Sequence, residues 1–251
     1  MTWVLLRGLA RESRHWGDFT QQLAASTGQA ALALDLPGNG AQFSDSSPAS
    51  VSSLLDALRH QIKARKLALP INVLAMSMGG MVATLWAQRY PQEVACLVLI
   101  NTSMRPFSGL TERLRPGIWP TLVKLAFYWE QADQVKQIES TIYKLTCQQA
   151  QQSDCELAHW SHIRQSAPVS AANALRQLLA AARFKCDPVP PICPMLVLSA
   201  KGDCLVNPIC SDRLVGAWQL RHHQHPWAGH DIPHDDGPWV CKQVTHWLTL
   251  K

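Results

Sequence analysis

Short runs of apolar residues alternate along the chain with longer segments in which apolar residues recur every three or four positions. Six runs predict strands, the last of them weakly: residues 3–6, 30–34, 72–76, 94–100, 195–198 and 220–225. Most of these runs lack polar alternation, which is typical of parallel strands buried on both faces. The pattern therefore predicts an α/β fold with a mostly parallel sheet of about six strands and helices on both faces.

Helical spacing fills the segments between these strands. It predicts helices over residues 16–25, 51–62 and 81–90, and a last helix from about Trp239 to Leu248. Each predicted helix separates two strands or follows the last one, as expected of a parallel sheet whose connections cross over its faces.

The pattern changes between residues 104 and 186. Strand-like runs disappear there, and helical stripes punctuated by prolines replace them. We therefore predict an α/β core from residues 1–103 and 187–251, with residues 104–186 inserted as a helical cap.

Composition limits the class of protein. The chain has 251 residues, of which 47% are hydrophobic and 16% charged, enough for one domain with a sizeable core. The net charge of +5 is spread along the chain without a basic cluster, so no nucleic-acid partner is expected. No apolar run approaches the roughly 20 residues that span a bilayer. With no secretory pattern and no C-x-x-C pair among eight cysteines, a cytoplasmic protein with unpaired thiols is expected.

Ser77 lies where the apolar run 72–76 meets a predicted helix. A serine hydroxyl is a weak nucleophile unless a base lies beside it. In a strand–serine–helix elbow the residues two before and two after the serine must be small, and here they are Ala75 and Gly79. The Met78 amide would then point at an oxyanion from a helix N-terminus. The alternative is a loop serine that caps a helix.

A base and an orienting acid are expected on loops that follow later strands, because the carboxyl ends of parallel strands carry the site. Asp203 follows the strand at 195–198, whereas Asp187 precedes it. His230 follows the last strand and a glycine, which makes it the best candidate base. His234 is a weaker one. The histidines around residue 225 lack a matching carboxylate pattern, so no metal site is expected.

The loop after the first strand should supply the second oxyanion donor. The Leu9 backbone amide is in that position. Arg7 has two interpretations, since it could bind a substrate carboxylate or brace the loop through hydrogen bonds to carbonyls.

Together these segments resemble the α/β-hydrolase superfamily. The matching motifs, in chain order, are residues 5–9, 35–40, 75–80, 202–206 and 229–230. The resemblance implies a catalytic triad of Ser77, Asp203 and His230, oxyanion donors at Leu9 and Met78, and strand order 2-1-3-4-5-6. Arg7 departs from the family, which usually has histidine before this glycine. The other departures are Asn39 within Gly38-Asn39-Gly40 and Ala75 in the elbow.

The resemblance extends to small carboxylesterases, including the pimeloyl-carrier-protein methyl ester esterase group. It implies a serine hydrolase without cofactors that cleaves a small ester or acyl substrate, free or bound to a carrier. Candidate pocket residues are Arg7, Met104, Phe107 and Trp129. The alternatives are acyl transfer, thioester or C–C bond hydrolysis by the same triad, or a ligand-binding protein that has kept the fold without catalysis.

Overall fold

The computed structural model describes residues 1–149 and 154–250. In these residues six parallel strands form one sheet in the order β2-β1-β3-β4-β5-β6. The strands are β1 (Trp3–Leu6), β2 (Ala31–Leu34), β3 (Ile71–Met76), β4 (Val94–Ile100), β5 (Met195–Ala200) and β6 (Arg221–His225). The predicted parallel sheet and its strand order are confirmed.

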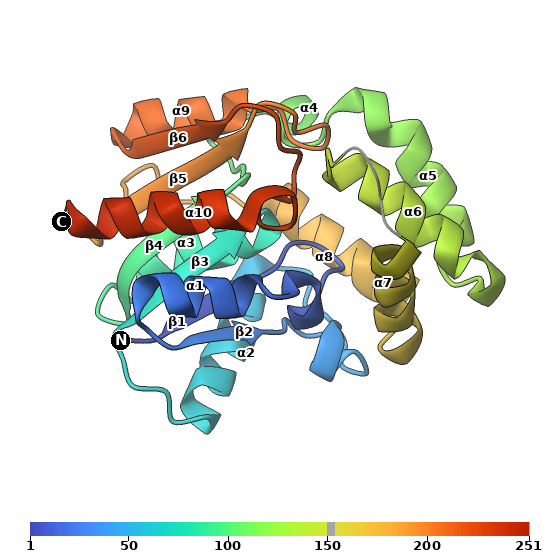
Figure 1. Ribbon diagram of the computed structural model, residues 1–251, viewed down its shortest axis with the longest axis horizontal. Helices are drawn as coiled ribbons and strands as arrows, with labels where there is room; N and C mark the ends of the chain where they lie inside the picture. The colour runs from blue at the N-terminus through green and yellow to red at the C-terminus, as the bar shows by residue number, and fades with distance from the viewer. Residues whose placement is uncertain (150–153, 251) are drawn as a thin grey trace.

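Helices cover both faces of this sheet (Figure 1). One face is packed by α1 (Phe19–Thr27) and α10 (Ile232–Thr249). The other is packed by α2 (Val51–Ala64), α3 (Met78–Arg89) and α9 (Ile209–Trp218). None of the helices in the described part of the chain is long and apolar enough to cross a membrane.

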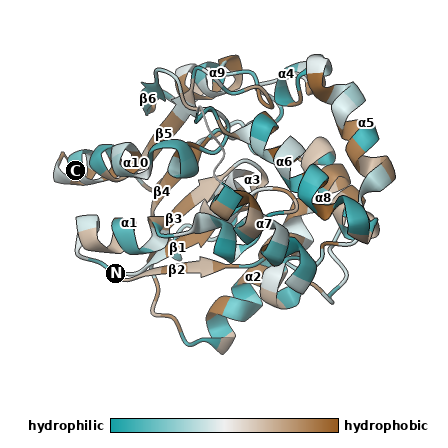
Figure 2. Cartoon of the chain, turned by 45° about the vertical axis from the view of Figure 1, so that its right-hand side comes forward, coloured by the Kyte–Doolittle hydropathy of each residue, from teal (hydrophilic) through white to brown (hydrophobic). Residues whose placement is uncertain are grey.

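The central strands are apolar because both of their faces are covered. All six residues of β3 are buried, and Val73 and Leu74 contribute to the cores on opposite faces of the sheet. Figure 2 shows the central strands in the brown of hydrophobic residues. The edge strand β6 is polar and only partly buried, because it has a single neighbour, β5. Its weak sequence signal follows from that position.

The segment between β4 and β5, residues 104–186, is here called the helical insertion. Its helices are α4 (Leu110–Arg113), α5 (Trp119–Tyr128), α6 (Val135–Thr146), α7 (Asp154–Ser166) and α8 (Ala171–Arg183). The two ends of the insertion lie side by side, since the Cys186 amide donates to the Arg105 carbonyl at 2.9 Å. Figure 1 shows α5, α6 and α7 beyond one end of the sheet.

One predicted helix start is wrong. The predicted helix over residues 16–25 is divided by Gly17, whose φ of +50° ends a 3₁₀ helix at Trp16 before α1 begins at Phe19. The Trp16 and Phe19 rings still stack on each other across this break. Their spacing of three residues is therefore the same as in a continuous helix.

The last helix lies close to its predicted bounds of about Trp239 to Leu248. α10 consists of a short helical segment from Ile232 and a longer one, and they meet at Asp236, where φ is −154° and ψ is 70°. The longer segment ends at Thr249, and at its start the Trp239 amide donates to the Asp236 carboxylate at 3.0 Å.

Candidate active site

Ser77 lies at a strained turn between β3 and α3. Its φ and ψ are +52° and −124°, a combination that costs about 1–3 kcal/mol for a residue with a side chain. Neighbouring strands hold the backbone there. The Ser77 amide donates to the Ile100 carbonyl at 3.0 Å, and the Thr102 hydroxyl donates to the Ser77 carbonyl at 2.7 Å. The turn therefore projects the serine side chain beyond the end of β3.

Gly79 and Gly8 let other backbone segments approach this turn. A Cβ atom at Gly79 would lie 2.5 Å from the Arg7 carbonyl oxygen, so only glycine fits where α3 crosses the end of β1. A Cβ atom at Gly8 would lie 2.9 Å from the Ser77 Cβ and 3.3 Å from its Oγ. The loop that carries the Leu9 amide therefore passes directly beside the Ser77 hydroxyl.

Asp203 and His230 are joined by a hydrogen bond of 2.7 Å between Oδ2 and Nδ1. The other carboxylate oxygen, Oδ1, accepts from the amides of Leu205 and Val206 at 2.8 and 2.9 Å. Both side chains are buried. Burial opposes the protonated form of His230, but the Asp203 carboxylate outweighs burial and raises the pKa of the imidazole. The pair leaves Nε2 of His230 for other contacts.

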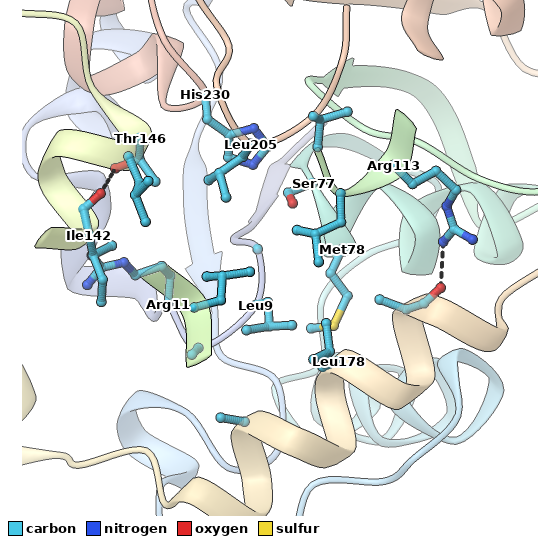
Figure 3. Close-up of a pocket in the computed structure, with 18 of the residues that line it drawn as sticks. Leu9, Arg11, Ser77, Met78, Arg113, Ile142, Thr146, Leu178, Leu205 and His230 are labelled. Carbon is cyan, nitrogen blue, oxygen red and sulfur yellow. Dashed lines mark hydrogen bonds between the residues drawn. The ribbon is translucent and has the colours of Figure 1, made fainter. Parts of the chain in front are cut away.

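Ser77 and His230 line the same cavity, whose volume is about 360 Å³ (Figure 3). Figure 3 shows both side chains reaching the same space, with Leu9 and Met78 beside it. Met78 is the first residue of α3, and the first amides of a helix have no carbonyl partner within it. The arrangement thus places a hydroxyl, an imidazole and two candidate backbone donors around one volume.

The helical insertion supplies most of the remaining wall, which is mostly apolar. Its contributors include Leu122, Leu125 and Trp129 around α5, Ile142 on α6 and Leu178 on α8. Trp129 is fixed there by a hydrogen bond of 2.7 Å from its indole N–H to the Val169 carbonyl. A cavity of this size and character is typical of sites for small apolar ligands.

Met104 and Phe107 do not belong to this wall. Met104 is 1% exposed within the core beneath the sheet face, and Phe107 packs edge-on against Trp218 at 5.2 Å. Their position after β4 suggested the cavity, but Met104 belongs to the core on the sheet face covered by α2, α3 and α9, and Phe107 packs against that core.

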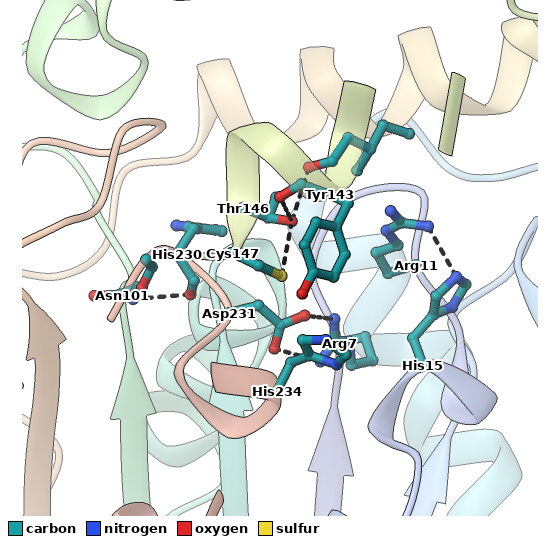
Figure 4. A network of polar contacts seen from close by, with 12 residues as sticks. Arg7, Arg11, His15, Asn101, Tyr143, Thr146, Cys147, His230, Asp231 and His234 are labelled. Carbon is teal, nitrogen blue, oxygen red and sulfur yellow. Dashed lines mark hydrogen bonds and ion pairs between the residues drawn. The ribbon is translucent and has the colours of Figure 1, made fainter. Parts of the chain in front are cut away.

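Arg7 pairs with a carboxylate rather than with carbonyls, which corrects the bracing contacts expected from the sequence. Its two terminal nitrogens donate to the two carboxylate oxygens of Asp231 at 3.1 and 2.5 Å (Figure 4). The guanidinium also lies 4.7 Å from the centre of the Trp16 ring. Burial would raise the pKa of Asp231, but Arg7 outweighs it and lowers that pKa. The pair joins the loop that carries Leu9 to the loop that carries His230.

Asn101 is a second link that the sequence did not reveal. Its side-chain amide donates to the carbonyls of Gly229 and His230 at 3.1 and 2.8 Å, and its side-chain oxygen accepts from the Ala200 amide at 3.0 Å. Its φ is +43°, a conformation that asparagine tolerates better than most residues. An asparagine directly after a buried strand was the available signal, and it ties the ends of β4 and β5 to the histidine loop.

The end of α6 also packs on the histidine loop. The Asp231 amide donates to the Thr146 carbonyl at 2.8 Å. Asp235 accepts hydrogen bonds from the amides of Gly229 and Gln148 at 2.7 and 3.0 Å. The helical insertion is thus bonded to the segment around His230 and does not merely cover it.

The remaining histidines of this region are held by separate partners. His222 lies 2.7 Å from the Ser199 hydroxyl, and His225 lies 3.2 Å from an Asp236 carboxylate oxygen. Both belong to β6, as expected, whereas His234 belongs to α10 and contacts the Tyr143 and Trp160 rings. Across residues 1–149 and 154–250, no three histidine, cysteine or acidic side chains gather as a metal-ligand set.

Comparison with known proteins gives the family of the chain. A family model described as alpha/beta hydrolase fold matches residues 4–237. The chain is 38% identical over 92 residues to Protein ABHD14A of Danio rerio and 35% identical over 102 residues to the pimeloyl-[acyl-carrier protein] methyl ester esterase of Chromobacterium violaceum. These matches cover 36% and 41% of this chain, and 34% and 37% of the relatives, about a third of their length.

Solved structures extend the likeness to the whole chain. A thermophilic esterase from Thermogutta terrifontis matches with a TM-score of 0.77 and 22% identity, over 99% of this chain and 89% of that chain. At this identity the likeness concerns the fold. With the family model spanning most of the sequence, the chain belongs to the α/β-hydrolase family.

Proposed function

We propose that this protein is a serine hydrolase that cleaves a carboxylic ester through an acyl-enzyme intermediate. The observation that carries the proposal is the hydrogen-bonded Asp203–His230 pair on the same cavity as the Ser77 elbow. An activated serine needs a base within reach and an acid that orients the base. The esterase names among the relatives support the same class of reaction.

Each group then has one role. His230 Nε2 takes the Ser77 proton as Oγ attacks the acyl carbon, and the Leu9 and Met78 amides stabilise the oxyanion. His230 next protonates the departing alkoxide, which leaves the acyl group on Ser77. A water molecule deprotonated by His230 attacks this acyl carbon, and the acid leaves as Ser77 recovers its proton. Asp203 keeps Nδ1 protonated and favours the imidazolium formed in both halves.

The apolar wall from the helical insertion favours the acyl part of the substrate. We propose that residues 104–186 act as a cap that bounds this acyl site, on a core made by residues 1–103 and 187–251. Arg7 lines the cavity, but its carboxylate partner, Asp231, makes it a brace rather than a receptor for a substrate anion.

A panel of p-nitrophenyl esters tests the proposal. Lengthening the acyl group from acetate to butyrate and hexanoate is expected to raise kcat/KM by about fourfold per methylene buried, because each removes apolar surface from water. The increase should stop once the chain exceeds the cavity. Failure of the folded protein to release p-nitrophenol faster than buffer, at every chain length, would contradict an ester hydrolase.

The pH dependence of the same assay reports on His230. The base must be neutral to accept the Ser77 proton, and Asp203 raises its pKa above the ordinary value of about 6.5. We therefore expect kcat/KM to fall as the pH is lowered through a midpoint above 6.5, while circular dichroism shows that the protein stays folded. A midpoint below 6.5 would mean that burial, and not Asp203, has the larger effect on the pKa of the His230 imidazole.

A further inference from the structure

Helix α5 exposes an unusual amount of apolar surface. All of its residues except Pro120, Thr121 and Lys124 are apolar, yet Leu125 is the one that is buried. Val123 and Phe127 are 71% and 76% exposed. Isolated exposed apolar residues are common, but two such side chains on a single short helix form a patch that needs an explanation.

The exposed side chains share one face of the helix. Trp119, Val123 and Phe127 follow one another at intervals of four residues, which places them in a row along α5. Trp119 is 41% exposed and extends the row to the start of the helix. Leu122 and Leu125, elsewhere on the circumference, line the cavity that Ser77 shares. Figures 1 and 2 show α5 at the outer edge of the molecule, so this helix forms a wall between the cavity and the surroundings.

We propose that Trp119, Val123 and Phe127 insert into the surface of a lipid aggregate, from which an acyl-chain ester enters the cavity beside α5. The inference rests on the proposed function and deepens it, because it names a water-insoluble, lipid-like ester as the substrate class. Helices that lie at membrane surfaces combine Trp, Phe and aliphatic residues on one face with lysine on another. α5 shares the apolar part of this pattern through Trp119, Val123 and Phe127, and Lys124 is its single charged residue.

A second copy of the chain fits this face less well. A ten-residue helix is about 15 Å long and about 10 Å wide, so its outer face offers roughly 150 Å². A stable protein interface buries about 800 Å² on each partner. A lipid surface needs no matching area, since a few aromatic and aliphatic side chains suffice to penetrate the headgroup boundary.

Vesicle binding tests the proposal without requiring turnover. The protein is mixed with vesicles of phosphatidylcholine and phosphatidylglycerol in equal parts and sedimented. The wild type is expected to sediment with the vesicles, and a Val123→Ser/Phe127→Ser variant to partition at least tenfold less. Neither residue lines the cavity. The variant should therefore keep the wild-type kcat/KM on soluble p-nitrophenyl butyrate but lose activity on a long-chain ester presented in the same vesicles.

Ile192→Ser is the matched control. Ile192 is 79% exposed and lies just before β5, at the amino end of the sheet, away from the cavity. This variant should bind vesicles like the wild type. Wild-type protein that stays in the supernatant, or a double variant that binds equally well, would overturn the proposal. Analytical ultracentrifugation that shows a wild-type dimer, and a monomer for the double variant, would also overturn it. So would an acyl-carrier protein that displaces the wild type from the vesicles by binding to the same face of α5. Absence of any esterase activity with vesicle binding intact would refute the proposed function alone.

Discussion

The Ser77→Ala variant is expected to turn over p-nitrophenyl butyrate on the order of 10⁴-fold or more slowly than the wild type, with little change in stability. Removing the nucleophile of a serine–histidine–acid site eliminates the covalent route, and what remains comes from binding and the oxyanion donors. The hydrogen bonds that hold residue 77 are made by its backbone N–H and C=O, which alanine keeps. The thermal midpoint should therefore stay close to that of the wild type.

Covalent labelling separates loss of the nucleophile from loss of the fold. A fluorophosphonate should add to the wild type at Ser77, as located by mass spectrometry of peptides, and should not add to the Ser77→Ala variant. Gly117→Ala is a suitable control, because a Cβ atom there meets no other atom within 4 Å, so both activity and labelling should persist. Label retained on the Ser77→Ala variant, or turnover equal to that of the wild type, would assign the chemistry to another group.

The sheet could be predicted because its strands are buried on both sides. Continuous apolar runs such as 94–100 are typical of strands that helices cover on both faces, so the pattern located the strands. The start of the first helix was missed for a local reason. Gly17 acts through its backbone conformation, and a count of apolar positions does not register a positive φ.

The candidate site could also be predicted only in part. The carboxyl ends of parallel strands meet at one edge of the sheet, so Ser77, Asp203 and His230 could be placed near one another from strand positions. The links between their loops could not. Arg7 and Asp231 are 224 positions apart, and nothing local to either residue indicates the other. Which side chains of the insertion line the cavity could not be predicted either. Helical spacing identifies an apolar stripe such as Leu122 and Leu125, but it does not indicate whether that stripe faces the cavity or another part of the core.

The buried pair of Arg7 and Asp231 should contribute strongly to stability at neutral pH. Arg7→Met would leave the Asp231 carboxylate buried without its cation, and we expect the free energy of unfolding to fall by about 3–5 kcal/mol. Asp231→Leu should cost a similar amount by stranding the guanidinium. The double variant should recover much of this loss, because neither charge is then left buried alone. Denaturant unfolding of the four proteins measures the coupling.

The sign of the pH dependence follows from the direction of the shift. Arg7 lowers the pKa of Asp231 in the folded state below its unfolded value near 3.9. The stability that the Arg7–Asp231 pair contributes is therefore fully present above the pKa of Asp231 in the unfolded chain. It is lost as the pH falls through the lower pKa of the folded protein. The wild type should lose more stability than the double variant between neutral pH and about pH 3. Equal slopes for the two proteins would show that the pair contributes nothing.

Arg7→Lys distinguishes a brace for the reacting groups from a merely stabilising pair. Lysine keeps the charge but cannot donate from two nitrogens in a fixed plane to both carboxylate oxygens. Since Arg7 lies two residues before Leu9 and Asp231 directly follows His230, a looser pair shifts the oxyanion loop against the base. Those groups act together only in the transition state, so kcat should fall tenfold or more while KM stays nearly constant. A variant that loses stability but keeps the wild-type kcat would show that the Arg7–Asp231 pair stabilises the fold without positioning the reacting groups.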